Sequence, residues 1–328
     1  MKKIIAILLM IFTCAVPLTV CAEEAEESRG NFVQEIAARD IFTHEGTTLP
    51  YRYILPEDYN TENTYPLVVF LHAEPERGND NNSQLKHGVN YIVDKIPDAI
   101  ILAPQCGVNN QWVDTPIEGG NYSIAEVPES DELVAVMALI SKMNTDYMVD
   151  TDRIYVVGAS MGGYGVWDLL MRHNETFAGG VVLCGGGDLS QAELLKNTPM
   201  YVFHGAQDEV LSPSVSREMT QSIYDVGGIK LRYFEVAKNT HEMYYQLWWG
   251  SQVMETLTNH RVSDKYINEE DIIDDIEGQE DVISDEAETV VDAGVVTPPS
   301  IWSILGYITG VILALTILII IVVKKKKI

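Results

Sequence analysis

Three side chains of the kinds used in nucleophilic catalysis follow one another along the chain as Ser160, Asp208 and His241. Ser160 stands at the centre of residues 158–162, which read Gly-x-Ser-x-Gly. A serine hydroxyl is a poor nucleophile until a histidine takes its proton, and that histidine needs an acid to orient it. The chain order serine, acid, histidine is the order that follows a nucleophile elbow, a sharp turn between a strand and a helix. We therefore predict that these three residues form a catalytic triad.

Other acids and histidines compete for the second and third places of the triad. Asp188 follows an earlier strand and remains the alternative acid, whereas Glu209 should point elsewhere if its neighbour Asp208 points at the base. His204 lies at a strand end and is expected to be a structural histidine. The remaining histidines fall in a turn, a loop and helix ends, where a lone histidine is usually a polar surface residue: His44, His87, His173 and His260.

Acyl transfer through a serine also needs two N–H donors aimed at the oxyanion of the tetrahedral intermediate. We expect them to be the backbone amides of Met161, directly after the serine, and of Glu74, in the loop after the apolar run 67–71. Pro75 lacks its own amide donor but leaves that of Glu74 in place. The Glu74 carboxylate opposes the developing negative charge unless Arg77 pairs with it. The segment 73–75 therefore bears on the strength of catalysis.

Strands and helices in alternation must position these residues. Residues 32–42 and 49–54 predict an antiparallel hairpin with a turn at residues 44–46. The apolar run at 67–71 is typical of a strand buried on both faces of a parallel sheet, and 99–103 is expected to be the next buried strand. Further strands are expected at 154–157, 180–183, 200–203 and 231–236. Helical patterns follow at 88–96, 128–143, 161–172, 190–196, 214–224 and 242–257. The pattern predicts one α/β domain over residues 31–260, with a mostly parallel sheet, an N-terminal antiparallel hairpin and helices on both faces.

Several motifs together resemble one family of exported proteins. They are Glu76-Arg77-Gly78-Asn79-Asp80-Asn81, Ala103-Pro104-Gln105-Cys106, the run from Gly158 to Asp168, Cys184-Gly185-Gly186-Gly187-Asp188 and Phe203-His204-Gly205-Ala206-Gln207-Asp208. The chain resembles the α/β-hydrolases called predicted peptidases, which are similar to polyhydroxybutyrate depolymerases, feruloyl and acetyl xylan esterases and dienelactone hydrolases. The resemblance implies the α/β-hydrolase fold and the same triad, with Arg77 and Trp112 bordering the substrate pocket. The segment 73–75 departs from the Gly-rich loop of that family.

The two ends of the chain predict export and a membrane anchor. Residues 1–22 carry two lysines, an apolar run and a small-residue cleavage site, which is typical of a signal peptide. Residues 301–323 are apolar without a charge and long enough to cross a bilayer. The basic tail 324–328 is expected in the cytoplasm by the positive-inside rule. We therefore expect a single-pass protein of the cell membrane with its catalytic domain outside the cell.

Acidic residues dominate the charge of the chain, whose formal net charge is −26. Nucleic-acid binding is excluded because phosphate neutralisation needs basic patches. Residues 261–300 are rich in Asp and Glu and are expected to form an extended, disordered stalk, since their spacing does not match a calcium-binding EF-hand loop. Cys106 and Cys184, which remain after the signal peptide, are expected to be free thiols because they follow strands that are not neighbours.

These observations favour a serine hydrolase, and within that class a carboxylic ester hydrolase that works through an acyl-enzyme. The expected substrate is a small-molecule or polysaccharide-linked ester, and neither a metal nor an organic cofactor is implied. A serine peptidase on the same fold is one alternative. A surface binding module that kept the triad but lost turnover through the altered loop is the other.

Overall fold

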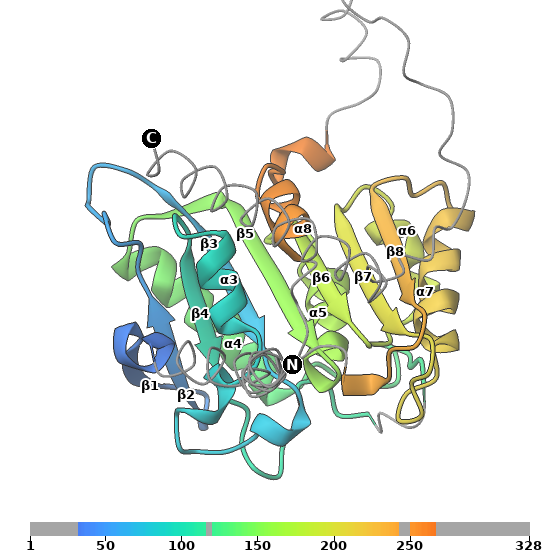
Figure 1. Cartoon of the computed structure of the whole chain (residues 1–328), viewed down its shortest axis with the longest axis horizontal. Helices are drawn as coiled ribbons and strands as arrows, with labels where there is room; N and C mark the ends of the chain where they lie inside the picture. The colour runs from blue at the N-terminus through green and yellow to red at the C-terminus, as the bar shows by residue number, and fades with distance from the viewer. Residues whose placement is uncertain (1–31, 116–119, 243–249, 267–328) are drawn as a thin grey trace, which may run out of the picture. The chain divides into compact units, whose positions relative to one another are not determined.

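A sheet of eight strands forms the centre of the computed structural model, which describes residues 32–115, 120–242 and 250–266 (Figure 1). The strands are β1 (Ala38–His44), β2 (Thr47–Ile54), β3 (Tyr65–Leu71), β4 (Ile100–Pro104), β5 (Val149–Ala159), β6 (Gly179–Leu183), β7 (Met200–Gly205) and β8 (Leu231–Val236). Their order across the sheet is β1-β2-β4-β3-β5-β6-β7-β8. β2 is antiparallel to both β1 and β4, and every other neighbouring pair is parallel. The predicted mostly parallel sheet with an antiparallel N-terminal pair is confirmed.

Several strands of the sheet are buried along their whole length because both faces of the sheet are covered. β3, β4 and β6 are buried at every position. Alternate residues of each strand belong to two separate apolar clusters, as Val68 and Val69 do. Uninterrupted apolar runs, rather than alternating ones, are what such a doubly covered strand requires.

Helices cover both faces, as predicted. The helices are α3 (Val89–Lys95), α4 (Asp131–Asp146), α5 (Met161–Arg172), α6 (Ala192–Leu195), α7 (Ser214–Asp225) and α8 (Gly250–Leu257). α3 and α8 lie in front of the sheet in Figure 1 and contribute to one cluster. α4, α5 and α7 contribute to the other. Ser130 begins α4 by accepting a hydrogen bond from the Leu133 amide, which is the usual function of an N-cap serine.

Two segments differ from the sequence predictions. Residues 32–36, predicted as part of a strand, are helical. The buried Arg52 guanidinium explains the turn, because it donates to the carbonyl oxygens of Gln34 and Ala37 at 2.6 and 2.8 Å. Residues 261–266, predicted to begin the stalk, pack against the domain instead, with the Lys265 ammonium donating to the Asn174 carbonyl oxygen at 2.8 Å. The described domain therefore extends to Tyr266.

The predicted membrane anchor at 301–323 lies outside the described residues, as do the signal peptide at 1–22, the stalk beyond residue 266 and the tail 324–328. Within the described part of the chain, no helix combines the length and the apolar character needed to span a bilayer. Cys106 and Cys184 both lie in the described part and are free, as predicted, and both are buried.

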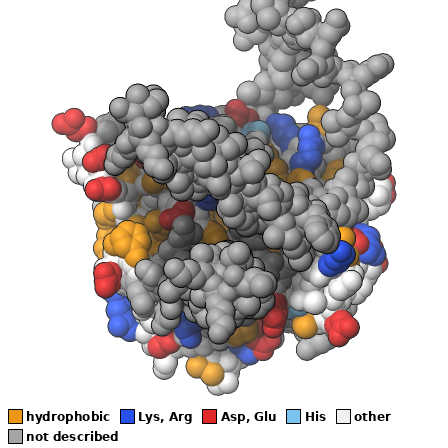
Figure 2. Space-filling model, viewed as in Figure 1, with side chains coloured by type: hydrophobic (Ala, Val, Ile, Leu, Met, Phe, Trp, Pro, Cys, Tyr) orange, Lys and Arg blue, Asp and Glu red, His pale blue; other side chains and the backbone are white. Residues whose placement is uncertain are grey.

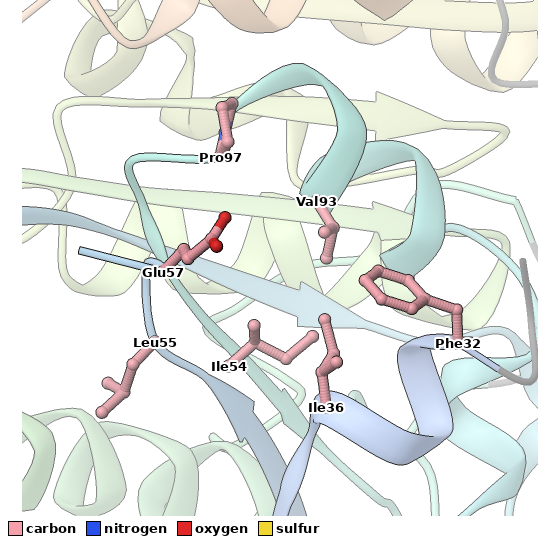
Figure 3. A pocket seen from close by; sticks show the side chains of 7 residues that line it. All are labelled: Phe32, Ile36, Ile54, Leu55, Glu57, Val93 and Pro97. Carbon is pink, nitrogen blue, oxygen red and sulfur yellow. The ribbon is translucent and has the colours of Figure 1, made fainter. Parts of the chain in front are cut away.

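Charged and apolar side chains are unevenly spread on the face shown in Figure 2. Acidic and basic side chains are scattered over its described surface, whereas hydrophobic side chains gather on the side that carries β1 and β2. An apolar pocket of about 530 Å³ lies on this side (Figure 3). Its lining comes from the N-terminal helical turn, the end of β2 and the region of α3: Phe32, Ile36, Ile54, Leu55, Glu57, Val93 and Pro97. Ile54 pairs with Ile101 at the start of β4, so the pocket lies at the amino-terminal edge of the parallel strands.

Candidate active site

The turn from β5 to α5 carries Ser160 in a conformation that few residues adopt. β5 ends at Ala159, α5 begins at Met161, and Ser160 between them has φ 52° and ψ −115°. Such backbone strain costs about 1–3 kcal/mol and persists only where surrounding contacts impose it. A Cβ atom on Gly158 would lie 2.3 Å from the Gly162 carbonyl oxygen, and one on Gly162 would lie 1.9 Å from that of Leu71. The two glycines are therefore required for the close approach of strand, turn and loop.

His241 lies between Ser160 and Asp208. Its Nε2 atom is 2.8 Å from the Ser160 Oγ atom, and its Nδ1 atom is 2.6 Å from the Asp208 Oδ2 atom. All three residues are buried, with 5%, 8% and 8% of Ser160, His241 and Asp208 exposed. Because an ionised carboxylate only accepts hydrogen bonds, the imidazole proton lies on Nδ1, and Nε2 is left to accept the serine proton.

Asp208 is held as an anion by several donors. The amides of Val210 and Leu211 donate to its Oδ1 atom at 2.9 and 2.8 Å. Burial alone would raise the pKa of this carboxyl group, but the hydrogen bonds from His204, His241 and the Leu211 amide outweigh it and hold the pKa well below its ordinary value. The acid next to the histidine is therefore charged at neutral pH.

The competing acids have other surroundings. Asp188 accepts hydrogen bonds from the amides of Ile124 and Ser190 at 2.8 and 2.9 Å, so it anchors a loop. Glu209 is exposed. Of the candidates weighed from sequence, the structure brings Asp208 to His241.

The amides expected to bind the oxyanion stand at the first positions of two helices. Met161 begins α5, and Glu74 begins the 3₁₀ helix η1 (Glu74–Glu76). An N–H at such a position has no acceptor within its own helix. The loop after β3 lies directly against the elbow, because a Cβ on Gly162 would also meet the His72 carbonyl oxygen at 2.9 Å. Both donors therefore belong to segments that touch at the carboxyl ends of β3 and β5.

His72 and Trp112 hold the loop after β3. The His72 Nδ1 atom is 2.6 Å from the Ala73 carbonyl oxygen, and its Nε2 atom accepts from the Cys106 amide at 2.9 Å. Complete burial lowers the pKa of His72 to about 4, so the ring is neutral. Trp112 donates from its indole N–H to the His72 carbonyl oxygen at 3.0 Å.

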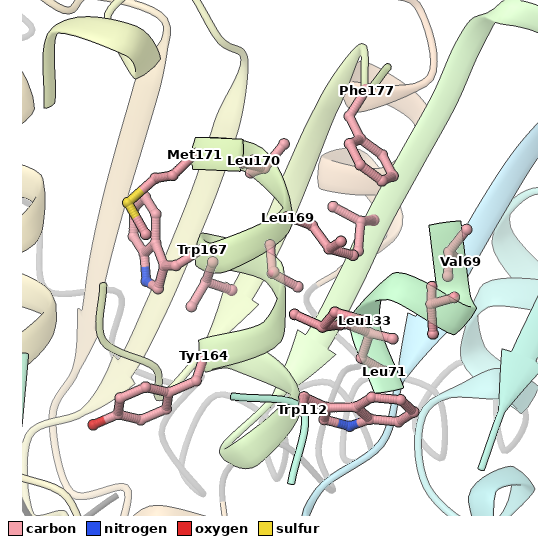
Figure 4. Packing of buried hydrophobic residues seen from close by; sticks show 14 of the residues in the cluster. Val69, Leu71, Trp112, Leu133, Tyr164, Trp167, Leu169, Leu170, Met171 and Phe177 are labelled. Carbon is pink, nitrogen blue, oxygen red and sulfur yellow. The ribbon is translucent and has the colours of Figure 1, made fainter. Parts of the chain in front are cut away.

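Trp112 does not border an open surface, which corrects its predicted place at the pocket. Its side chain is fully buried and packs with Leu71 and Leu133 beneath the loop (Figure 4). The indole has an apolar body and one donor, and both are used inside the domain. Trp112 therefore supports the loop that carries Glu74.

Arg77 and Glu74 form an ion pair on the outer side of the same loop. The Arg77 guanidinium also donates to the Asn110 carbonyl oxygen at 3.3 Å. The two side chains are 24% and 53% exposed. The carboxylate expected to oppose an oxyanion is therefore neutralised by a cation three residues away.

Residues 120–127 form hydrogen bonds with side chains of α5. No sequence pattern predicted this contact. The Tyr122 hydroxyl donates to the Asp168 carboxylate at 2.7 Å, and the Arg172 guanidinium donates to the Val127 carbonyl oxygen at 2.6 Å. The Tyr164 hydroxyl donates to the Gly120 carbonyl oxygen at 2.9 Å. These contacts fix α5, whose first residues form the elbow, to a loop that precedes it in sequence.

A strained serine between a parallel strand and a helix, with a histidine and an aspartate after later strands, defines an α/β-hydrolase. The family model described as "Putative esterase" matches residues 46–279, so the chain belongs to this family and is a serine hydrolase by family and fold. A solved thermostable esterase is similar at 31% identity and a TM-score of 0.64, over 70% of this chain and 64% of that one. A ferulic acid esterase shares the fold at 18% identity and a TM-score of 0.53, over 68% of this chain and 98% of that one.

A curated relative is a peptidase. Dipeptidyl-peptidase 5 of Porphyromonas gingivalis is 22% identical over 147 residues, which cover 44% of this chain and 20% of the peptidase. This chain thus spans a fifth of that peptidase and less than two thirds of the thermostable esterase.

Proposed function

We propose that this protein is a serine esterase that hydrolyses carboxylic esters through an acyl-enzyme. The observation that carries the proposal is the hydrogen-bonded series of the buried residues Ser160, His241 and Asp208, with distances of 2.8 and 2.6 Å. Membership of an esterase family supports the ester as substrate. A small-molecule ester and a polysaccharide-linked ester both remain within the proposal.

The side chains act in sequence. His241 takes the Ser160 proton on Nε2 as the Oγ atom attacks the ester carbonyl, and Asp208 stabilises the imidazolium that results. The amides of Met161 and Glu74 bind the oxyanion of the tetrahedral intermediate. His241 then gives its proton to the leaving alcohol. In the second half, water attacks the acyl-enzyme with His241 again as base, and the acid is released.

Cellular location is part of the proposal. The signal peptide at 1–22 and the apolar segment 301–323 support a single-pass membrane protein with the hydrolase domain outside the cell. An ester substrate would then be met at the cell surface.

A serine peptidase is the second candidate, favoured by the similarity to dipeptidyl-peptidase 5. Ser160 would then attack a peptide amide with His241 as base, so the two functions differ in the kind of bond that is cleaved. A binding module without turnover is the third candidate.

One experiment separates the three functions. The full chain and its Ser160→Ala variant are compared on p-nitrophenyl esters, feruloylated and acetylated sugars and peptide amides, with labelling by a fluorophosphonate. We expect ester hydrolysis that falls by about a thousandfold or more in the variant, as triad deletions do. Hydrolysis of amides alone would identify a peptidase. Absence of both turnover and labelling in the wild-type chain would leave the binding module.

A further inference from the structure

Two histidines contact the same oxygen of Asp208. The Nδ1 atom of His241 is 2.6 Å from Asp208 Oδ2, and the Nε2 atom of His204 is 3.1 Å from it. His204 lies near the end of β7 and is completely buried. Asp208 therefore has a second imidazole on the oxygen that the proposed mechanism uses.

The surroundings of His204 fix a proton on Nε2. This atom also lies 2.9 Å from the Leu211 carbonyl oxygen. A carbonyl and an ionised carboxylate both accept hydrogen bonds and cannot donate them. His204 is therefore a donor to Asp208 Oδ2, in competition with His241.

The other ring nitrogen also has an acceptor nearby. Nδ1 of His204 is 2.8 Å from the Ser216 Oγ atom, and the Ser216 hydroxyl donates to the Gly185 carbonyl oxygen at 3.0 Å. A hydroxyl has one proton but two lone pairs. The Ser216 hydroxyl therefore links the His204 ring to the Gly185 carbonyl oxygen.

We propose that His204 is a positioning residue that fixes the Asp208 carboxylate and lowers the basicity of His241. The inference rests on the proposed function, because it assigns His241 as the base. A donor on Oδ2 withdraws negative charge from the oxygen that stabilises the His241 imidazolium. Without His204, Asp208 would stabilise this cation more strongly, and the carboxylate would also lose one of the contacts that orient it.

Other ionisable groups near the two rings are already paired or buried. Glu235 is the neighbour of His204 on β8, and its carboxylate is bound by the Arg217 guanidinium at 2.6 and 2.8 Å. The Cys184 thiol lies 3.9 Å from the His241 carbonyl oxygen, and burial raises its pKa above the ordinary range. Near neutral pH, Glu235 and Cys184 therefore each keep a fixed charge.

Two variants test the inference in the full chain. His204→Gln keeps a neutral N–H donor near the position of Nε2, whereas His204→Met fills the space without a donor. The pH dependence of kcat/KM on a p-nitrophenyl ester reports the base, and the low-field proton resonance of the His241–Asp208 hydrogen bond reports it without turnover. For His204→Met we expect an acid limb higher by about one pH unit and a kcat about tenfold lower. We expect His204→Gln to recover most of kcat.

Control variants distinguish the loss of the His204 contact from a loss of stability and from a failure of the proposed function. Glu235→Gln removes a neighbouring carboxylate without touching Asp208 and should leave the acid limb in place. If His204→Met does not fold, Ser216→Ala leaves the His204 ring in place but removes its Nδ1 partner, together with the hydrogen bond to the Gly185 carbonyl oxygen, and should raise the acid limb by a few tenths of a pH unit. Folded variants of His204 and Ser216 with the wild-type acid limb, kcat and proton resonance would overturn the inference. Failure of the proposed function would appear instead as a wild-type chain without Ser160-dependent hydrolysis.

Discussion

The ion pair between Glu74 and Arg77 determines how the segment 73–75, after β3, affects the rate of catalysis. From sequence, the Glu74 carboxylate is a charge near a developing oxyanion, and its effect depends on whether Arg77 pairs with it. The two side chains do pair, on the more exposed side of the loop. Arg77 therefore screens the Glu74 carboxylate, so an effect of this carboxylate on catalysis should appear when the Arg77 cation is removed.

We predict that Arg77→Ala lowers kcat/KM on a neutral ester by about threefold to tenfold, because an unpaired Glu74 would then repel the oxyanion. Glu74→Ala should change it by less than about threefold, and the double variant should regain most of the loss. Steady-state kinetics of the four proteins at low ionic strength measure the coupling. A tenfold gain in Glu74→Ala would mean that Arg77 does not neutralise the carboxylate.

Asp188 and Asp208 offer a matched pair of aspartates after neighbouring strands. Asp208→Asn should lower kcat by about a thousandfold or more, because an amide can hold the wrong tautomer of His241. Asp188→Asn should keep kcat and lower the thermal midpoint by a few degrees, since the amide can accept only part of the loop contacts. Equal losses of kcat in the two variants would contradict the assignment of Asp208.

At the residue scale, the sequence predicted the triad residues, whose order along the chain is typical of a nucleophile elbow. It did not predict the residues whose function depends on packing between distant segments. Ser160, Asp208 and His241 have type, order and flanking strands to mark them. The buried place of Trp112 depends on how the loops after β3 and β4 meet. The second histidine on Asp208 depends on a turn that brings Leu211 back to His204, and no residue pattern reports such a turn.

At the scale of elements, the elbow depends on space that only glycine leaves. A Cβ on Gly162 would overlap the Leu71 carbonyl oxygen, whereas one on Gly46, in the hairpin turn at φ 95°, would meet nothing within 4 Å. Gly46 therefore serves as a control for backbone strain without overlap.

We expect Gly162→Ala to abolish fluorophosphonate labelling of Ser160 and to destabilise the fold by about 3 kcal/mol or more, since backbone must move. Gly46→Ala should cost only about 1 kcal/mol and keep the labelling. Urea unfolding and labelling of both variants measure this. A labelled and fully stable Gly162→Ala variant would show that the loop after β3 can retreat from the elbow.

Elements with a strong local signal were predicted well, and those set by distant contacts were not. α5 was expected at 161–172 and spans Met161–Arg172, because the elbow fixes its start. Residues 32–36 form a helical turn because the buried Arg52 guanidinium donates hydrogen bonds to the carbonyl oxygens of Gln34 and Ala37. Residues 261–266 lie in an acidic, polar sequence, yet Asp152 and Asn174 of the domain bind them.

At the scale of the whole molecule, the ionisation of Glu76 makes the free energy of unfolding depend on pH. Burial raises the pKa of this carboxyl group to about 7, from an ordinary 4.5. A group whose pKa is higher in the folded state contributes stability that is complete below pH 4.5 and is lost as the pH rises through 7. Glu76→Gln removes the ionisation, so it should be more stable than the wild type at pH 8, by on the order of 2 kcal/mol, and equally stable at pH 4.5. Urea unfolding at the two pH values tests this, and an equal effect at both would exclude Glu76 as the titrating group.

The described chain ends on the side of the domain opposite to Ser160. The Ser263 hydroxyl and amide both donate to the Asp152 carboxylate, at 2.8 and 2.9 Å, and the Val262 amide donates to the Asp152 carbonyl oxygen at 3.0 Å. Asp152 lies near the start of β5, and Ser160 follows its end. At about 3.3 Å per residue, the strand separates the two by roughly 26 Å. The last described residues therefore lie at the opposite end of β5 from the candidate active site.

This geometry makes the proposed topology testable on intact cells. A glutamate-specific protease added outside should cut within residues 267–299, where acidic residues are dense and the composition predicts an extended stalk. We expect the released domain to keep the kcat of the full chain, because the cut lies beyond the contacts of Asp152 and Asn174 that hold residues 262–265. Cells that express Ser160→Ala should release a domain of the same size without activity. Activity that stays latent until the cells are lysed would show that the domain is not outside the cell.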